Sequence, residues 1–355
     1  MDEFASISYW TGQRALSKQQ ERRGVAIGIG DDAASVDLEA AADGVASPKR
    51  LLLTADTMVE TVHFNDRTMR EEDIGYKALA ASISDIAAMG GVPLHALVSV
   101  SVPPAYGAER MRRVFDGLYE CAERYGIAVV GGDTTSAPQH LVINVALTGT
   151  VEAGCELSRA GAKPGDAVFV TGTVGMAAAG LHVLLGKEQH SPLTHKELAP
   201  LIGAHRRPAP CIEAGRMLAR SGACHALNDI SDGLASEAWE IAEASGLRVV
   251  LRESALPRSG TMSKYASKAG ANPLEWMLYG GEDYTLLGTM ASEKAAALQQ
   301  QFRAAGIPMF VIGSTEAGKP GVDLVQEEPH SPRGAGSGTA ARMPLEKRGY
   351  NHFKG

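Results

Sequence analysis

Apolar residues in the first half of the chain recur with two different periods. Between 71 and 89 they return every three or four positions, which predicts an amphipathic helix that ends at Gly90-Gly91. The same period predicts a second helix over 109–125, closed by Gly126. Other stretches alternate or form short apolar runs, as strands do. The segments expected to be strands in this half are 51–53, 95–102, 127–130 and 141–151.

A turn-rich stretch with Gly161, Pro164 and Gly165 follows, and it predicts a domain boundary near 152–165, which gives domains of 1–152 and 153–355. The helices expected after it are 174–185, 208–220, 233–244 and 292–305, and the strands are 167–171, 247–251, 284–287 and 309–312. Residues 328–341 are rich in Pro, Gly, Ser and Ala, which is typical of a mobile loop. The pattern indicates an α+β fold of two α/β domains rather than one doubly wound parallel sheet.

Composition narrows the class of function. Of 355 residues, 45% are hydrophobic, and no apolar run approaches the roughly 18 residues needed to cross a bilayer. The 34 basic and 41 acidic side chains give a formal charge of −7, which argues against a nucleic-acid binder. The N-terminus lacks the apolar segment of a secretory signal, and the four cysteines form no closely spaced pair. We therefore expect a cytoplasmic protein with reduced thiols and no membrane partner.

Acidic residues gather at the ends of apolar segments, mostly beside glycine, which permits tight turns and close approach of a ligand. These residues are Asp31, Asp32, Asp56, Asp133, Asp229, Asp232, Glu282 and Asp283. Asp85 differs because it lies inside the first expected helix, where Ala78, Ala81 and Ala88 form a stripe of small residues around it. This stripe would let another backbone or a ligand approach the carboxylate.

Carboxylates that converge on one place repel one another. A pair 4 Å apart costs about 1 kcal/mol in water and about 4 kcal/mol at an effective dielectric constant of 20. A converging set therefore calls for cations, and oxygen ligands without His or Cys favour Mg²⁺. The alternative, which spacing leaves open, is that these Asp residues only cap helices and turns.

The common nucleotide-binding motifs are absent from the sequence. It contains no P-loop, no dinucleotide-binding fingerprint, and no protein-kinase catalytic loop or DFG motif. Gly172-Thr173-Val174-Gly175 follows an expected strand and precedes an expected helix, as phosphate loops do, but it fits a simple helix entry better. Any phosphoryl transfer by this chain would use another fold.

Eight sequence blocks occur in order across almost the whole chain. They are 28–32, 54–64, 84–90, 131–134, 158–166, 229–234, 280–284 and the tail Gly349-Tyr350-Asn351-His352-Phe353. Together they closely resemble the thiamine-monophosphate kinase family. That family belongs to the superfamily of aminoimidazole ribonucleotide synthetase, selenophosphate synthetase and the hydrogenase maturation dehydratase.

The resemblance implies transfer of the γ-phosphate of ATP to thiamine monophosphate, with several Mg²⁺ ions, to give thiamine diphosphate and ADP. It also implies a mixed N-terminal sheet that pairs with its twin in a homodimer, followed by a C-terminal α/β domain. Carried over onto this sequence, the implied metal ligands are Asp32, Thr54, Ala55, Asp56, Asp85, Asp133, Asp229 and Asp232. The implied ATP contacts are Gly132, Asp133, Arg159 and Ser231, and the implied contacts to the thiamine phosphate are His63, Glu282 and Lys347.

The chemistry of these residues agrees with the resemblance. The fork of donors on Arg159 suits a phosphate, and Glu282 can accept hydrogen bonds from an aminopyrimidine. No acid is left over as a general base, because each is better used on metal. The chain departs from the family at Ala55, where Thr is frequent, and at Lys347, where an aromatic residue is frequent. Tyr350 or Trp276 would then supply the aromatic wall for the thiamine ring.

Other enzymes of the superfamily and a non-catalytic nucleotide-binding protein are the alternatives. Selenophosphate synthetase would need a reactive Cys in an N-terminal loop, and the first 120 residues contain none. The hydrogenase maturation enzyme would need a C-terminal Cys, and this tail ends in His352-Phe353-Lys354-Gly355. A reaction of the ribonucleotide synthetase type stays open, and formation of ADP only in the presence of thiamine monophosphate would distinguish it from the kinase.

Overall fold

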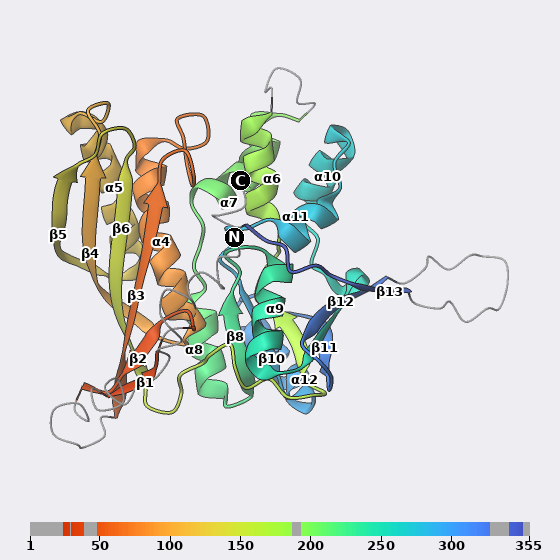
Figure 1. The fold of residues 1–355 in the computed structure, drawn as a ribbon. Helices are drawn as coiled ribbons and strands as arrows, with labels where there is room; N and C mark the ends of the chain where they lie inside the picture. Colours follow the sequence, from red (N-terminus) through yellow and green to blue (C-terminus); the bar gives the residue numbers. More distant parts are fainter. Residues whose placement is uncertain (1–23, 29, 39–47, 187–192, 327–340, 351–355) are drawn as a thin grey trace.

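Two mixed β-sheets lie side by side in the computed structural model, each with its own helices (Figure 1). The structure describes residues 24–28, 30–38, 48–186, 193–326 and 341–350. The first half contains β1 (Val25–Ile27), β2 (Ala34–Val36), β3 (Lys49–Val59), α4 (Glu71–Ala88), β4 (Val92–Val102), α5 (Ala108–Tyr125), β5 (Ala128–Ser136) and β6 (Val142–Glu152). These strands form one sheet in the order β1-β2-β3-β6-β4-β5, in which only the β4–β5 pair is parallel.

The second sheet has the strand order β13-β12-β9-β11-β7-β10-β8. Its strands are β7 (Ala167–Val170), β8 (Cys224–Asp229), β9 (Arg248–Arg252), β10 (Leu286–Met290), β11 (Phe310–Glu316), β12 (Gly321–Gln326) and β13 (Ala341–Pro344). The helices of this half are α6 (Met176–Leu185), α7 (His195–Arg206), α8 (Ile212–Ser221), α9 (Leu234–Ser245), α10 (Gly260–Ala269), α11 (Pro273–Tyr279) and α12 (Ala295–Ala304). Two short 3-10 turns, η2 (Glu253–Ala255) and η3 (Ser292–Lys294), complete the described part.

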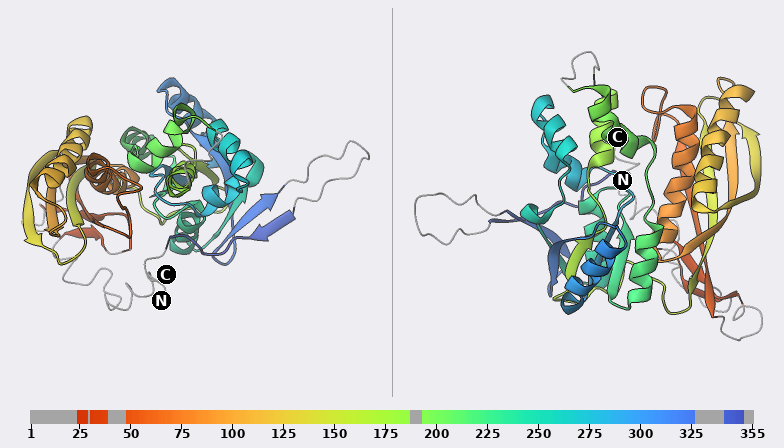
Figure 2. Two further views of the ribbon diagram at one scale, coloured as in Figure 1. Left: turned by 90° about the horizontal axis from the view of Figure 1, so that it is seen from above. Right: turned by 180° about the vertical axis from the view of Figure 1, so that it is seen from behind.

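Helix α4 lies between the first sheet and the second half of the molecule (Figure 2). Glycines allow its neighbours to approach its backbone closely. A Cβ on Gly75 would lie 1.8 Å from the carbonyl oxygen of Val114 in α5, and a Cβ on Gly117 would lie 1.8 Å from that of Glu72. On the other side, a Cβ on Gly215 of α8 would lie 2.1 Å from the carbonyl oxygen of Ala87. Both contacts hold α4 firmly in place.

The first sheet buries one face under α4 and α5 and leaves much of the other face open. Side chains alternate between the faces of a strand, so Leu52 and Met58 of β3 are buried while Leu53 is 40% exposed. Leu97 of β4 and Val130 of β5 are exposed as well, at 49% and 59%. We call the face that carries Leu53 and Leu97 the outer face of the first sheet.

The two helices expected in the first half are confirmed to within one residue at either end. Several strand predictions are wrong in extent, two of them at candidate site residues. Asp56 does not terminate its strand, because β3 continues to Val59, and Asp133 lies within β5 rather than after it. Helices α7, α10 and α11 escaped the sequence analysis, although Thr194 and Glu197 form a capping box at the start of α7. The loop expected at 328–341 lies outside the described residues up to 340, and Ala341 begins β13. Within the described ranges, no helix has the length and apolar character to span a membrane.

Candidate active site

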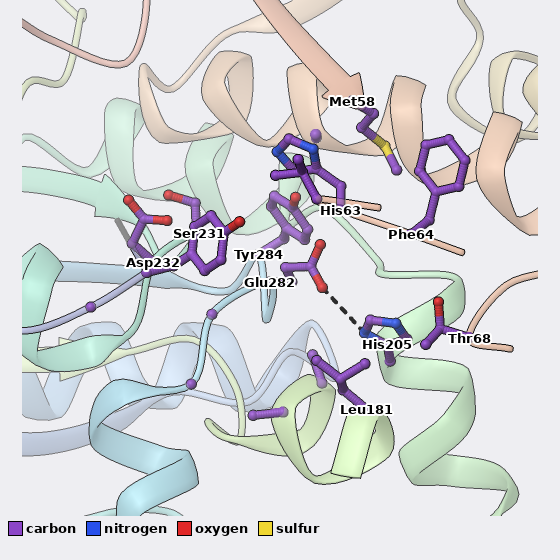
Figure 3. A pocket seen from close by; sticks show the side chains of 18 of the residues that line it. Met58, His63, Phe64, Thr68, Leu181, His205, Ser231, Asp232, Glu282 and Tyr284 are labelled. Carbon is purple, nitrogen blue, oxygen red and sulfur yellow. Dashed lines mark ion pairs between the residues drawn. The ribbon is translucent and has the colours of Figure 1, made fainter. Parts of the chain in front are cut away.

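A cleft of about 1160 Å³ lies between the two halves of the molecule, and Figure 3 shows part of its lining. The first half contributes β3 and the segment that follows it, from Ala55 to Thr68. The second half contributes α6, the end of α11, the turn after β8 at Ser231 and Asp232, and the loop 280–284. Gly349 and Tyr350 line it from the C-terminal tail.

Backbone strain marks this cleft. Three non-glycine residues of the described chain have positive φ, and all three line the cleft: Thr61 at 71°, Glu282 at 68° and Tyr284 at 50°. Such conformations cost about 1–3 kcal/mol each and persist where the surrounding structure enforces them, often at functional sites. The strained loop 280–284 is held by hydrogen bonds from Glu282 N to Ser231 O at 2.6 Å and from Tyr284 N to Ile230 O at 2.9 Å.

A carboxylate cluster adjoins the cleft at its inner side. Asp32 follows β1, Asp85 lies in the last turn of α4, and Asp229 ends β8, yet one carboxylate oxygen from each lies within 4.8 Å of the others. Thr54 of β3 donates its hydroxyl hydrogen bond to Asp85, and Ser84 donates to Asp229 at 2.5 Å. Three elements distant in the sequence therefore bring three acids together, as the sequence analysis expected.

Burial dominates the electrostatics of this cluster. It raises the pKa of Asp229 to about 6, and it raises the pKa values of Asp32, Asp56 and Asp85, with neighbouring carboxylates adding to the shift at Asp32 and Asp85. One oxygen each of Asp32 and Asp56 is buried without a hydrogen-bond partner among the described residues. Unpaired, buried, hard oxygen acceptors fit a magnesium ion, which prefers carboxylate ligands. These four acids are the residues that could hold one.

Arg159 is the cationic side chain nearest to the cluster in the described part of the chain. Its guanidinium pairs with Asp32, lies 3.1 Å from Glu240 and donates to Asn228 at 3.2 Å. Asn228 in turn donates to Glu237 at 2.6 Å, and burial raises the pKa of Glu237. The arginine therefore lies among carboxylates at the edge of the cluster. A phosphate that bound there would compete with these carboxylates for the guanidinium.

The pleat of β3 decides which of its residues face the cluster. Thr54 and Asp56 point toward α4, because Thr54 bonds to Asp85 and the Asp56 carboxylate is close enough to raise the pKa of Asp85. Ala55 lies between them and therefore turns its side chain to the outer face. The missing hydroxyl at Ala55 thus leaves the side-chain surroundings of Asp85 unchanged.

The structure does not bring Gly132 and Asp133 to the cluster within one chain. Asp133 is paired with Ser99, Ser99 with Asn144, and Asn144 with Thr57, so all four lie in one row across the sheet. Thr57 is on the outer face, so Asp133 points away from the cluster, and three strand spacings place it roughly 14 Å from β3. Gly132 lies beside it in the same edge strand and is exposed.

Ser231 and Asp232 form the turn between β8 and α9 at the rim of the cleft (Figure 3). Glu237, in the first turn of α9, accepts from the backbone N–H of Asp232 at 2.9 Å and from the Ser231 hydroxyl at 3.4 Å. The C-terminal tail closes over this turn, since Tyr350 N donates to Asp232 O at 3.2 Å. The turn that the sequence singled out is therefore part of the cleft.

Lys347 lies outside the residues that line the cleft, and its Nζ is 2.6 Å from Glu243 on α9. Aromatic side chains reach the cleft from elsewhere. Trp276 of α11 stacks on Tyr265 at 5.8 Å between ring centroids, and it lies 5.1 Å from the ring of His182. Trp276 and Tyr350 both line the cleft, which agrees with the aromatic wall expected from one or the other.

His63 and Glu282 also line the cleft, and the Lys77 partner of Glu282 lies about two turns of α4 away from Asp85. The Nδ1 atom of His63 accepts from Val59 N at 2.9 Å, so the neutral ring carries its proton on Nε2. Glu282 lies 2.5 Å from Lys77 Nζ and 3.2 Å from His205 Nδ1. Burial alone would raise the pKa of Glu282, but the Lys77 charge and His205 outweigh it and lower that pKa to about 2.

Sequence reasoning missed Lys77 and His205. A signal for Lys77 was present, because it stands four residues before Ala81 and eight before Asp85 and so lies on the same stripe of α4. A lysine on a stripe of alanines that leads to a site is a candidate for that site. No local pattern distinguishes His205, which lies in a helix that the sequence analysis did not find.

Comparison with known proteins gives a consistent result over the whole chain. Residues 30–151 match the family model of AIR synthase related protein, N-terminal domain, and residues 163–325 match that of AIR synthase related protein, C-terminal domain. The chain is 41% identical to thiamine-monophosphate kinase of Bacillus subtilis over 355 residues, with 100% of each chain covered. It is 34% identical to thiamine-monophosphate kinase of Salmonella typhimurium over 335 residues, with 94% of each covered.

A solved structure described as AaThiL complexed with AMPPCP and TMP has a similar fold. The TM-score is 0.77 at 31% identity, and the match covers 99% of this chain and 97% of that one. The fold of both halves therefore has a counterpart in a protein described as a complex with AMPPCP and TMP.

Proposed function

This chain belongs to the thiamine-monophosphate kinase family, and on that premise we propose that it transfers the γ-phosphate of ATP to thiamine monophosphate, giving thiamine diphosphate and ADP. One observation carries the proposal: one cleft is lined both by Asp56, which neighbours the buried carboxylate cluster, and by a corner with aromatic walls and the Glu282 carboxylate. The cluster suits metal-bound phosphates, and the corner suits a cationic ring with amine donors. The similar structure complexed with AMPPCP and TMP supports both assignments.

Several Mg²⁺ ions would be held by Asp32, Asp56, Asp85 and Asp229, with Asp232 and the Thr54-Ala55 backbone beside them. Bound Mg²⁺ supplies positive charge that neutralises the phosphates as they approach each other. Arg159 would leave part of its carboxylate pairing to bind a phosphate, with Ser231 at the rim contacting ATP.

The acceptor needs no general base. A phosphate monoester has its second pKa near 6 and is therefore a dianionic nucleophile at pH 7 to 8. Catalysis then consists of aligning two anions and neutralising them. His63 and Glu282, with Trp276 and Tyr350 as the aromatic wall, would hold the thiamine end.

We propose that the site is completed in a homodimer formed through the outer face of the first sheet. That face exposes Leu53 and Leu97, and the edge strand β5 leaves Val130 exposed. Such apolar, edge-bearing surfaces favour pairing with a second copy. The dimer would also bring Gly132 and Asp133 of one protomer to the cluster of its partner.

Two further assignments follow from the same reading. We place the domain boundary between β6 and β7, with domains 1–152 and 153–355, because each sheet is built from one side of it. We place the enzyme in the cytoplasm, since the four cysteines are free thiols and ATP is a substrate.

Product analysis tests the activity. The purified protein is incubated with ATP and Mg²⁺ and either thiamine monophosphate or free thiamine, and the products are separated by chromatography. We expect thiamine diphosphate and ADP in the first reaction and no ADP in the second, with a rate that falls below about pH 6 as the acceptor protonates. Conversion of free thiamine at a comparable rate, or no conversion of either, would refute the proposal.

Complementation between two inactive variants tests the dimer. Asp85→Asn and Asp133→Asn chains with different tags are co-expressed, and the mixed dimer is purified through both tags. If Asp133 acts on the partner's cluster, one of the two sites in the mixed dimer is intact, and about half of the wild-type activity returns. If the mixed dimer is as inactive as its parents, Asp133 acts in the site of its own chain. If light scattering shows a monomer, the proposed homodimer is refuted.

A further inference from the structure

Glu282 is held by two buried side chains from different parts of the molecule. Its Oε1 atom lies 2.5 Å from Lys77 Nζ on α4, and its Oε2 atom lies 3.2 Å from His205 Nδ1 on α7, as Figure 3 shows for the second contact. The side chains of Lys77 and His205 are 0% and 2% exposed, whereas that of Glu282 is 24% exposed and faces the cleft. The carboxylate is therefore the accessible end of a buried arrangement.

Lys77 is placed where its charge has no other use in the described structure. Its Nζ lies 2.5 Å from Glu282 Oε1, and Glu282 is the acid that offsets the loss of water around it. A buried ammonium costs several kcal/mol unless a partner compensates. An apolar side chain of the same length would fill this space without the free-energy cost of burying a charge. We therefore expect the ammonium of Lys77 to serve the Glu282 carboxylate.

His205 contributes direction rather than charge. Burial, together with the nearby Lys77 charge, lowers the pKa of His205, so the ring is neutral, and its Nδ1 atom lies 3.2 Å from Glu282 Oε2. Each oxygen of Glu282 thus has one buried nitrogen behind it, and the carboxylate stays accessible from the cleft. Asp283 does not compete, because its carboxylate accepts from Gly175 N and from Ala177 N at the start of α6.

We propose that Lys77 and His205 are positioning residues that hold the Glu282 carboxylate in place as the acceptor for the ring end of the acceptor substrate. This inference rests on the proposed function and deepens it. Of the other acids that line the cleft, Asp56 neighbours Asp85 of the cluster and Asp232 lies in the turn after β8. Lys77 and His205 therefore act on affinity for thiamine monophosphate and not on ATP binding or on the transfer step.

Kinetics with the two substrates varied separately test this inference. Lys77→Met removes the ammonium and keeps the length of the side chain. We expect a KM for thiamine monophosphate about tenfold higher or more, with kcat and the KM for ATP within about twofold of wild type. Lys264→Met is the matched control, because it makes the same change at an exposed ion pair with Glu197, and we expect wild-type constants for it.

The double variant distinguishes a role in positioning Glu282 from a general loss of structural stability. If Lys77 acts through Glu282, then Lys77→Met added to Glu282→Gln raises the KM for thiamine monophosphate no further than Glu282→Gln alone. His205 gives an independent pair: His205→Asn keeps a donor near Nδ1 and is expected to stay near wild type, whereas His205→Leu raises the same KM. The His205 pair decides the matter if Lys77→Met does not fold.

The outcomes separate this inference from the activity itself. A wild-type protein that does not phosphorylate thiamine monophosphate overturns the proposed function. A wild-type protein that does so, with a raised KM in Glu282→Gln but unchanged constants in Lys77→Met and His205→Leu, overturns the positioning role alone. Equal losses in kcat and in both KM values would also overturn it, because they indicate a structural role.

Discussion

Buried carboxylates at the cluster and at the Glu282 corner of the cleft have pKa values shifted in opposite directions. At the cluster, Asp85 and Asp229 lie among other acids, and burial raises their pKa values. At the corner, Glu282 has Lys77 and His205 behind it, and its pKa is lowered to about 2. Both places use acids removed from bulk water, so residue type and burial do not explain the difference. At the cluster, Arg159 pairs with Asp32 and leaves Asp85 and Asp229 among acids, whereas Glu282 has the Lys77 ammonium 2.5 Å away.

The largest expected effect comes from Asp85→Asn at the cluster. Removing one cation ligand is expected to lower kcat by about 100-fold or more, because the phosphates lose the charge that stabilises the transition state. The same change relieves repulsion, so we expect a higher melting temperature in EDTA. Rates and thermal melting check both parts, with Asp116→Asn on the exposed face of α5 as control. A variant that melts lower than wild type in EDTA would contradict this account of the cluster.

Glu282→Gln is expected to change stability in the opposite direction. At pH 7 the variant leaves Lys77 buried without its partner, which costs about 3 kcal/mol of unfolding free energy. Because the folded pKa of Glu282 is about 2 and its ordinary value is 4.5, the ionic stabilisation is complete above about pH 5 and disappears as the pH falls toward 2. Urea unfolding at pH 7 and at pH 3 measures this. The difference between the two proteins must shrink at pH 3, and a constant difference would exclude the ion pair as its cause.

Mg²⁺ is expected to distinguish the cluster from the corner directly. At 100 times its dissociation constant, an ion that binds only the folded chain stabilises it by about 2.7 kcal/mol. We expect this rise in the melting temperature for wild type and for Glu282→Gln, since the corner carries no metal ligand, and a much smaller rise for Asp85→Asn. An equal rise in all three proteins would place the ion elsewhere.

The smallest expected effect is that of Ala55→Thr. The side chain at this position faces the outer side of β3, away from Asp85. We expect kcat to change by less than about threefold, because the added hydroxyl points away from Asp85 and no side-chain ligand of the cluster is removed. A larger gain in Mg²⁺-dependent rate would mean that the added hydroxyl reaches the metal.

The sequence contained the parts of this site that depend on local periodicity. The period of α4 predicted the helix that carries Asp85, and Asp229 stood at the end of an apolar segment, which the structure shows to be strand β8. The orientation of Asp133 was harder to predict, because its pairing with β4 and a bulge between Ala96 and Leu97 decide on which face of the sheet it lies. Such register depends on contacts between strands and has no local signature.

The corner at Glu282 could not be assembled from the sequence for a related reason. The Gly280–Tyr284 motif indicated the acid, but its partners Lys77 and His205 lie on helices whose positions depend on how the two halves pack together. Gly75 and Gly117, whose contacts fix α4 against α5, resemble ordinary helix residues in the sequence. Packing between domains is therefore where sequence reasoning stopped.

Helix α4 carries both Lys77, beside Glu282, and Asp85 of the cluster. Eight residues of α-helix rise about 12 Å, and the close contacts with α5 and α8 keep this length constant. If the proposed acceptor binds with its ring at Glu282 and its phosphate at the cluster, the helix keeps these two positions a fixed distance apart. Thiamine diphosphate is one phosphate longer than the monophosphate, so it would not fit both positions in the same way. On this proposal, the rigid helix would favour a single addition of phosphate.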